Sequence, residues 1–221
     1  MRIHPAGKNI VSTATLILGT IALISIMVIP YKLFWLTFLV LFCLLIIGIW
    51  IVSFFRYPQR SIENPKDNHL YSAADGEVVV IEKIKSNLFP ENEAYQISVF
   101  MSIYSVHINY VPINGTISSV THRKGLHLMA IKPKASLENE QCETIINTKN
   151  QKKVIVRQIA GAAARRVLTF VKPEQEVIAG NELGFIRFGS RVDIIFPVNS
   201  EINVKIGDKV KGCKTILATI N

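Results

Sequence analysis

The sequence predicts a mainly β fold, a compact β-barrel or sandwich, preceded by an N-terminal hydrophobic helical hairpin. Two observations lead to this prediction. Two long stretches near the N-terminus contain no charged side chain, and the remainder of the chain consists of short segments rich in β-branched and aromatic residues, separated by Gly, Pro and Asn. An internal repeat near the C-terminus is a third observation, and it indicates the type of barrel.

The hairpin is predicted by residues 9–30 and 33–55, which contain no charged side chain. The hydrocarbon core of a bilayer is about 30 Å thick and requires roughly 20 apolar residues in a helix, so each stretch is long enough to cross it. We expect residues 1–55 to form a membrane anchor with Pro30 and Lys32 at its tip. Two buried core helices are the alternative, but so much apolar helix would exceed the needs of a core of this size.

Basic residues that flank the two stretches predict the orientation of the hairpin. Arg2 and Lys8 precede the first stretch. Arg56 and Arg60 follow the second, whereas the tip carries only Lys32. Because cytoplasmic flanks of membrane helices are enriched in Lys and Arg, both ends and the whole remaining domain are expected on the cytoplasmic face of the cell membrane.

The overall charge points to a lipid surface as partner. The formal net charge is +9, and no Asp or Glu precedes residue 56. A basic domain suits an anionic membrane, which contributes about 1 kcal/mol per basic residue close to its surface. Lys and Arg are scattered without aromatic interleaving, which argues against nucleic acid. The three cysteines, Cys43, Cys142 and Cys213, are far apart, so neither a disulfide framework nor a metal site is predicted.

The domain at residues 56–221 is predicted to be built from short strands with turn residues between them. The predicted strands are 76–84, 95–101, 107–111, 115–120, 152–160, 167–171, 183–188, 191–196, 202–206 and 215–220.

The internal repeat consists of residues 171–186 and 204–220, which align with one inserted residue. Both copies read as strand, turn, valine, glycine, strand, which is similar to the two halves of biotinyl and lipoyl carrier domains and predicts a hybrid-barrel-like fold. Such carriers display a lysine at the hairpin tip between the halves, whereas this chain has no lysine in its FGSRVD sequence, residues 188–193. The repeat therefore indicates architecture. A membrane-anchored biotinyl/lipoyl-like adaptor module without catalysis, with an uncut chain, remains the alternative.

The Gly189-Ser190 pair within FGSRVD can undergo self-cleavage chemistry as well as form an ordinary turn. A serine hydroxyl can attack the preceding carbonyl, which converts an amide into an ester, and elimination from that ester leads to a ketone at the serine position. Glycine tolerates the distorted backbone that this requires. The pair alone is typical of a turn, so its interpretation depends on the rest of the chain.

Four further blocks precede the Gly-Ser pair: SAADGEVVVIE (72–82), MSIYSVHINYVPINGTI (101–117), KASLENE (134–140) and IAGAAARRV (159–167). With RFGSRVD, these blocks stand in the order found in phosphatidylserine decarboxylases, and the chain resembles the short bacterial and archaeal type over about residues 50–197. The resemblance implies a carboxy-lyase of phospholipid biosynthesis whose substrate is phosphatidylserine in an anionic membrane.

The resemblance also implies how the enzyme matures. The precursor would cut itself between Gly189 and Ser190 into a β chain, residues 1–189, and an α chain, residues 190–221, which stay together as a heterodimer and can assemble further. Ser190 would become a covalent pyruvoyl group that forms a Schiff base with the substrate, and phosphatidylethanolamine and CO2 would be the products. A metal-dependent hydrolase is disfavoured, because the sequence has no His-x-His or His-Glu-x-x-His spacing.

Three residues are expected to carry the chemistry. Ser190 is the nucleophile of self-cleavage, and it requires a base beside it. His107 lies in a block that matches the family's VH-x-N-x-x-P pattern and is the expected base and later proton donor, although a lone histidine in an apolar strand is more often a core residue. Asp75 would orient His107, as the acid of a Ser-His-Asp triad does, although Asp-Gly is also a plain turn.

Arg165, Arg166 and His127 are weak candidates for contacts to the substrate phosphate. Support of the fold is an equally good interpretation of the two arginines, and a solvated loop is the more typical one for His127. The chain also departs from the family at two positions. Gln141 replaces the arginine of a common Asn-Glu-Arg motif, and Tyr104 stands where the longer bacterial enzymes carry a histidine.

Overall fold

The computed structural model describes residues 2–126, 138–161, 167–187 and 190–221. The chain forms two compact units, Met1–Pro58 and Gln59–Asn221, each of which is described by itself.

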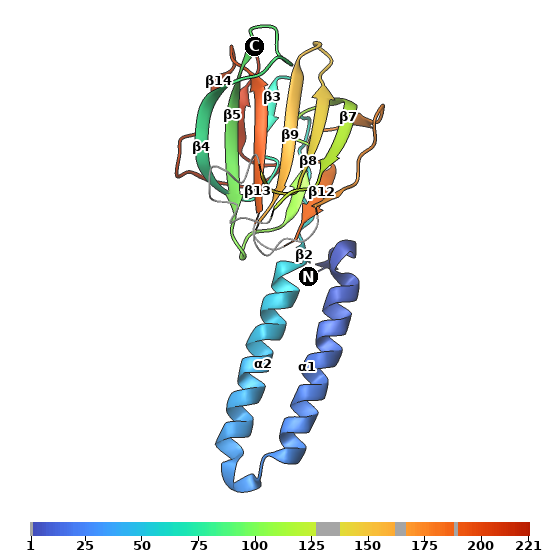
Figure 1. The fold of residues 1–221 in the computed structure, drawn as a ribbon, viewed down its shortest axis with the longest axis vertical. Helices are drawn as coiled ribbons and strands as arrows, with labels where there is room; N and C mark the ends of the chain where they lie inside the picture. Colours follow the sequence, from blue (N-terminus) through green and yellow to red (C-terminus); the bar gives the residue numbers. More distant parts are fainter. Residues whose placement is uncertain (1, 127–137, 162–166, 188–189) are drawn as a thin grey trace. The chain divides into compact units, whose positions relative to one another are not determined.

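The first unit is a hairpin of two apolar helices, α1 (Lys8–Val28) and α2 (Phe34–Phe54). Both helices (Figure 1) are long and apolar enough to cross a membrane, with mean hydropathies of 2.2 and 2.8, and Val11 and Phe54 are their only buried residues. Two short strands, β1 (Arg2–Ile3) and β2 (Arg56–Tyr57), pair at the open end of the hairpin. Gly7 is required there, because a Cβ atom at this position would lie 2.2 Å from the Phe55 ring. The predicted helical hairpin is confirmed.

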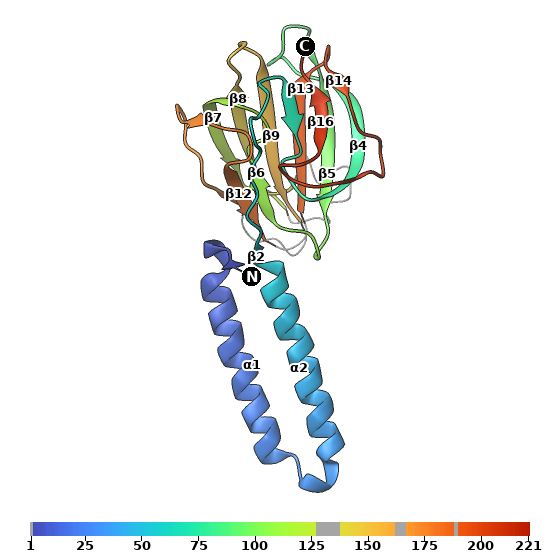
Figure 2. The same cartoon turned by 180° about the vertical axis from the view of Figure 1, so that it is seen from behind.

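The second unit is built around a curled eight-stranded antiparallel sheet (Figure 1). Its strands, in spatial order, are β11 (Glu176–Val177), β7 (Gly115–Arg123), β8 (Gln141–Asn147), β9 (Lys153–Ala160), β13 (Ser190–Pro197), β5 (Glu93–Met101), β4 (Gly76–Lys85) and β15 (Lys209–Val210). Two three-stranded sheets cover one side of it, as Figure 2 shows. They are β10 (Val167–Thr169), β12 (Glu182–Ile186) and β6 (Ile108–Tyr110), and β14 (Glu201–Ile202), β16 (Ile216–Thr219) and β3 (His69–Tyr71). The predicted mainly β fold is confirmed.

Strand β13 lies at the centre of the large sheet and is buried along its whole length. Side chains alternate between the two faces of a strand. Val192, Ile194 and Phe196 point into the main core, whereas Ile195 packs in a smaller cluster with Phe89. A strand buried on both faces reads as a nearly continuous apolar run, which agrees with IIFP, residues 194–197, in the second half of β13.

The internal repeat is visible in the backbone. Glu174 and Gly207 occupy equivalent positions with φ of 67° and 93°, and Gly180 and Cys213 form a second pair with φ of 94° and 64°. The two copies supply β11 and β15, the strands at the two edges of the large sheet. The repeat is therefore architectural, as the sequence predicted.

Candidate active site

Ser190 is the first residue of β13 and is fully buried. It pairs with Met101 on β5 and with Ala160 on β9, so its backbone is held from both sides. Its hydroxyl donates a hydrogen bond to the Met101 sulfur, with Oγ and Sδ 3.1 Å apart. The other half of the predicted cleavage site, Gly189, lies outside the described residues.

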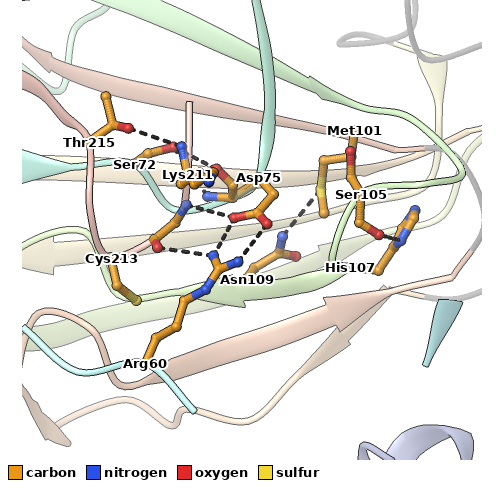
Figure 3. A network of polar contacts seen from close by, with 12 residues as sticks. Arg60, Ser72, Asp75, Met101, Ser105, His107, Asn109, Lys211, Cys213 and Thr215 are labelled. Atoms are coloured by element: carbon orange, nitrogen blue, oxygen red, sulfur yellow. Dashed lines mark hydrogen bonds and ion pairs between the residues drawn. The ribbon is translucent and has the colours of Figure 1, made fainter. Parts of the chain in front are cut away.

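His107 lies between the turn that follows β5 and the first residue of β6, and it is buried. Its Nδ1 is 2.9 Å from the backbone carbonyl of Ser105 (Figure 3). A carbonyl can only accept, so this contact places a proton on Nδ1, and in a neutral imidazole the lone pair then lies on Nε2. The ring packs against Phe185, with centroids 6.5 Å apart. This geometry gives His107 the tautomer that a general base requires.

Asp75 is engaged in a different cluster. Its two carboxylate oxygens accept hydrogen bonds from the two terminal nitrogens of Arg60, of which the Nη2–Oδ2 contact is 2.7 Å. The Gly212 amide donates to Oδ1 at 2.8 Å, and the Gly212 carbonyl accepts from Arg60 at 3.1 Å. The paired side chains are 12% and 14% exposed, and the hydrogen bond to Asp75 raises the pKa of Arg60. Such a two-point contact between guanidinium and carboxylate is strong and directional.

The structure therefore places the three predicted catalytic residues in two groups. Ser190 and His107 flank the end of β5, through Met101 and through the turn that follows it. The described hydrogen bonds of Asp75 go to Arg60 and Gly212, and that of His107 Nδ1 goes to Ser105. Figure 3 shows Met101 between Asp75 and His107. The orienting role of Asp75 stays a prediction.

The turn that contacts the first copy of the repeat shows what the fold requires at the Asp75 position. Asn114 precedes Gly115 at the start of β7, as Asp75 precedes Gly76 at the start of β4. The Asn114 oxygen accepts a hydrogen bond from the Ala179 amide at 2.9 Å, which corresponds to the bond from Gly212 to Asp75. A neutral amide is thus sufficient to hold this turn. The negative charge at Asp75 and the Arg60 beside it exceed what the architecture requires.

A chain of hydrogen-bonded side chains leads from Met101, the partner of Ser190, into the domain, and the sequence alone did not identify it. Asn109 donates to Met101 Sδ at 3.5 Å and accepts from Gln158 at 2.8 Å. Thr169 in turn donates to Gln158 at 2.8 Å. Gly184 makes room for this chain, because a Cβ atom there would lie 2.6 Å from Gln158 Nε2. Buried polar groups need such partners, so the network fixes the orientation of the Asn109 amide beside Met101.

Other predicted positions give less information. His127, Arg165 and Arg166, the candidates for the substrate phosphate, lie outside the described residues. Within the described parts of the chain, no group of three or more His, Cys, Asp or Glu side chains could hold a metal ion. Arg60 is a further site residue that the sequence alone does not identify, because its neighbourhood, RYPQR, indicates a basic flank of the second helix.

The family model and the curated relatives that match this chain all belong to one family. Residues 47–218 match the family model described as phosphatidylserine decarboxylase. The chain is 35% identical over 221 residues to the phosphatidylserine decarboxylase proenzyme of Parabacteroides distasonis, with all of both chains covered. It is 36% identical over 220 residues to that of Bacteroides fragilis, covering 100% of this chain and 96% of the relative. It is 41% identical over 175 residues to the phosphatidylserine decarboxylase proenzyme of Amoebophilus asiaticus, covering 79% of this chain and 77% of the relative.

These matches show that the protein is a carboxy-lyase of phospholipid metabolism. The chain belongs to the phosphatidylserine decarboxylase family, and this membership supports decarboxylation of phosphatidylserine as its reaction. The resemblance inferred from the five sequence blocks is confirmed. An adaptor module without catalysis is not supported.

Proposed function

We propose that the chain is a precursor that cuts itself between Gly189 and Ser190 and then decarboxylates phosphatidylserine to phosphatidylethanolamine as a pyruvoyl enzyme at the cytoplasmic face of the cell membrane. The observation that carries the proposal is Ser190. Ser190 starts the central strand, is fully buried and is held by both neighbouring strands. Burying its hydroxyl there costs free energy, because the acceptor is a thioether, which accepts only weak hydrogen bonds. The relatives are named proenzymes, which agrees with a cleavage step.

Self-cleavage balances with water as the only co-reactant. Ser190 Oγ gives its proton to the base and attacks the Gly189 carbonyl carbon; the carbon–nitrogen bond breaks, and the Ser190 nitrogen takes up a proton. The resulting ester loses the Cα proton of residue 190, and its Cβ–Oγ bond breaks, which leaves Gly189 as a C-terminal carboxylate. Water then hydrolyses the remaining enamine after its tautomerisation, ammonia leaves, and a ketone remains at residue 190.

His107 is the proposed base for these proton transfers, because its favoured tautomer places a lone pair on Nε2 and the Ser105 carbonyl holds the ring. Asp75 is proposed to act mainly in this maturation. Its charge is not needed to hold the turn before β4, since Asn114 holds the equivalent turn without a charge. Arg60 would hold the carboxylate in a fixed position.

The surroundings of residue 190 fit a pyruvoyl group. The position is shielded from solvent, and pairing with Met101 and Ala160 would hold the residue after it becomes a chain terminus. The ketone supplies an electrophile for the substrate amine and an electron sink for decarboxylation, which no natural side chain offers. His107 would hold and return the proton that the product carbon requires.

The two products of cleavage are expected to stay associated. Residues 190–221 contribute β13 to the centre of the large sheet and β15 to its edge. They also contribute β14 and β16 to a smaller sheet with β3. Residues 1–189 supply the strands on both sides of β13, so separating the chains would break the main core.

The experiment that tests the function is conversion of phosphatidylserine labelled at its serine carboxyl, with purified full-length protein in mixed micelles. Wild type should release labelled CO2 and form phosphatidylethanolamine, and Ser190→Ala should do neither. Ser200→Ala is the matched control, because Ser200 is also buried and follows the same strand, but its hydroxyl bonds the Pro197 carbonyl. Conversion by Ser190→Ala at the rate of the control would overturn the proposal.

A further inference from the structure

The turn between β5 and β6 presents two apolar side chains to solvent. Ile103 is 42% exposed and Tyr104 is 73% exposed. Single exposed apolar residues are common on protein surfaces. These two are adjacent, and they lie at the end of β5 where Met101 pairs with Ser190. Figures 1 and 2 both show this turn at the end of the sheet where β13 begins.

The same end of the sheet carries a third exposed apolar residue with basic neighbours. Leu126 is 57% exposed and follows Arg123 and Lys124, both of which are exposed. Arg123 pairs with Gln141 at the end of β7, one position from the row of residues that contains Ser190 and Ala160. Exposed apolar side chains beside basic ones are typical of surfaces that meet anionic lipid.

The backbone of the turn suits a medium that offers few hydrogen bonds. The Ser105 amide donates to the Ser102 carbonyl at 2.9 Å, and the Tyr104 amide donates to the Ser102 hydroxyl at 3.3 Å. The Ser105 carbonyl faces His107 Nδ1 at 2.9 Å. Backbone groups that are satisfied within the protein reduce the cost of leaving water.

We propose that the turn Ser102–Ser105 inserts Ile103 and Tyr104 into the surface of an anionic bilayer and so brings the end of the β unit that holds Ser190 against the lipid. The occupant is a membrane because the same chain carries two helices that are long and apolar enough to span one. This inference rests on the proposed function, since a two-chain lipid substrate leaves the bilayer only at about 0.8 kcal/mol per exposed CH2 group. The turn that meets the lipid is also the turn that fixes the His107 ring.

The connection at the other end of β5 provides a matched control. Leu88 is 40% exposed and lies in the β4–β5 connection, at the opposite end of β5. A strand rises about 3.3 Å per residue, so the nine residues of β5 separate the two turns by roughly 30 Å. A quencher placed near the lipid head groups can therefore distinguish one end from the other.

The first experiment does not depend on catalysis. Full-length protein with Cys43→Ser carries Tyr104→Cys or Leu88→Cys, each labelled with an environment-sensitive fluorophore; Cys142 and Cys213 are buried. In vesicles of phosphatidylcholine and phosphatidylserine, the label at residue 104 should shift to the blue and be quenched by head-group nitroxide lipid. The label at residue 88 should show neither effect. Equal quenching at both sites, or quenching at residue 88 alone, would overturn the proposal.

The second experiment uses turnover by self-cleaved protein. Each apolar side chain that enters the membrane raises the equilibrium constant for insertion of the turn about tenfold. For Ile103→Ser/Tyr104→Ser, the ratio of the rate on vesicles to the rate on dihexanoyl phosphatidylserine should fall about tenfold or more. Leu88→Ser should keep the wild-type ratio. If wild type neither cleaves nor turns over, the proposed function fails; if wild type works and both variants keep its ratio, only the membrane contact fails.

Discussion

Replacing Asp193 by Asn tests whether a buried ion pair anchors the strand that carries Ser190. Asp193 is fully buried, and Arg191 is 2% exposed. Arg191 Nε donates to Asp193 Oδ1 at 2.6 Å, and Nη2 approaches Oδ2 at 3.3 Å. Among the described residues, Arg191 Nη1 has no hydrogen-bond partner. The substitution would therefore leave a buried guanidinium without its counter-charge, which costs about 3–5 kcal/mol.

The assay is urea unfolding by pulse proteolysis, with Asp193→Asn in a Ser190→Ala background so that every sample is a single chain. Tryptophan fluorescence is unsuitable, because Trp35 and Trp50 both lie in α2. With a urea dependence of roughly 2 kcal/mol per molar, the expected loss lowers the unfolding midpoint by about 1.5–2.5 M.

Two control variants test whether the loss of stability comes from the burial of the ion pair. Arg191→Met/Asp193→Leu should recover most of the loss, because apolar residues of similar size can replace a buried pair. Glu143→Gln breaks a pair whose side chains are 26% and 24% exposed, Arg157 and Glu143, and should cost about 1 kcal/mol or less. If the midpoint for Asp193→Asn moved no further than that for Glu143→Gln, the reasoning about burial would be refuted.

Two further predictions concern the turn before β4 and the C-terminal repeat. Gly76→Ala should destabilise the β unit by several kcal/mol, because its Cβ atom would lie 2.1 Å from the Phe100 carbonyl oxygen, and urea unfolding would show no loss if the backbone could shift freely. Burial raises the pKa of the Cys213 thiol to about 12, so iodoacetamide at pH 8.5 should label it only after unfolding. Because the unfolded thiol loses its proton near pH 9.0, the free energy of unfolding should fall as pH rises from there toward 12, and Cys213→Ser should weaken that slope.

The parts of the fold that follow from local patterns could be predicted from the sequence. Uncharged stretches of helical length predicted α1 and α2, and β-branched segments between turn residues predicted most strands of the β unit. The repeat could be aligned because its two copies need the same turns, and the structure shows positive φ at both equivalent positions in each copy.

Less of the candidate site could be predicted from the sequence, because its contacts join segments that are far apart in the sequence. His107 and Ser190 follow from matching blocks, but no local pattern predicts that Met101 accepts the Ser190 hydrogen bond or that Gln158 orients Asn109. The pairing of Arg60 with Asp75 likewise depends on the path of the chain before β3. Periodicity describes which face a residue occupies, whereas these contacts depend on the registers of nonadjacent strands.

Intact mass of the purified full-length protein beside Ser190→Ala tests the central claim most directly. The account predicts that wild type separates under denaturing conditions into residues 1–189 and residues 190–221. The smaller piece should be lighter than its encoded mass by one ammonia, and cyanoborohydride with a primary amine should add to it alone. Ser190→Ala should remain a single chain of encoded mass. A wild-type chain that stays whole in membranes after prolonged incubation would contradict the account.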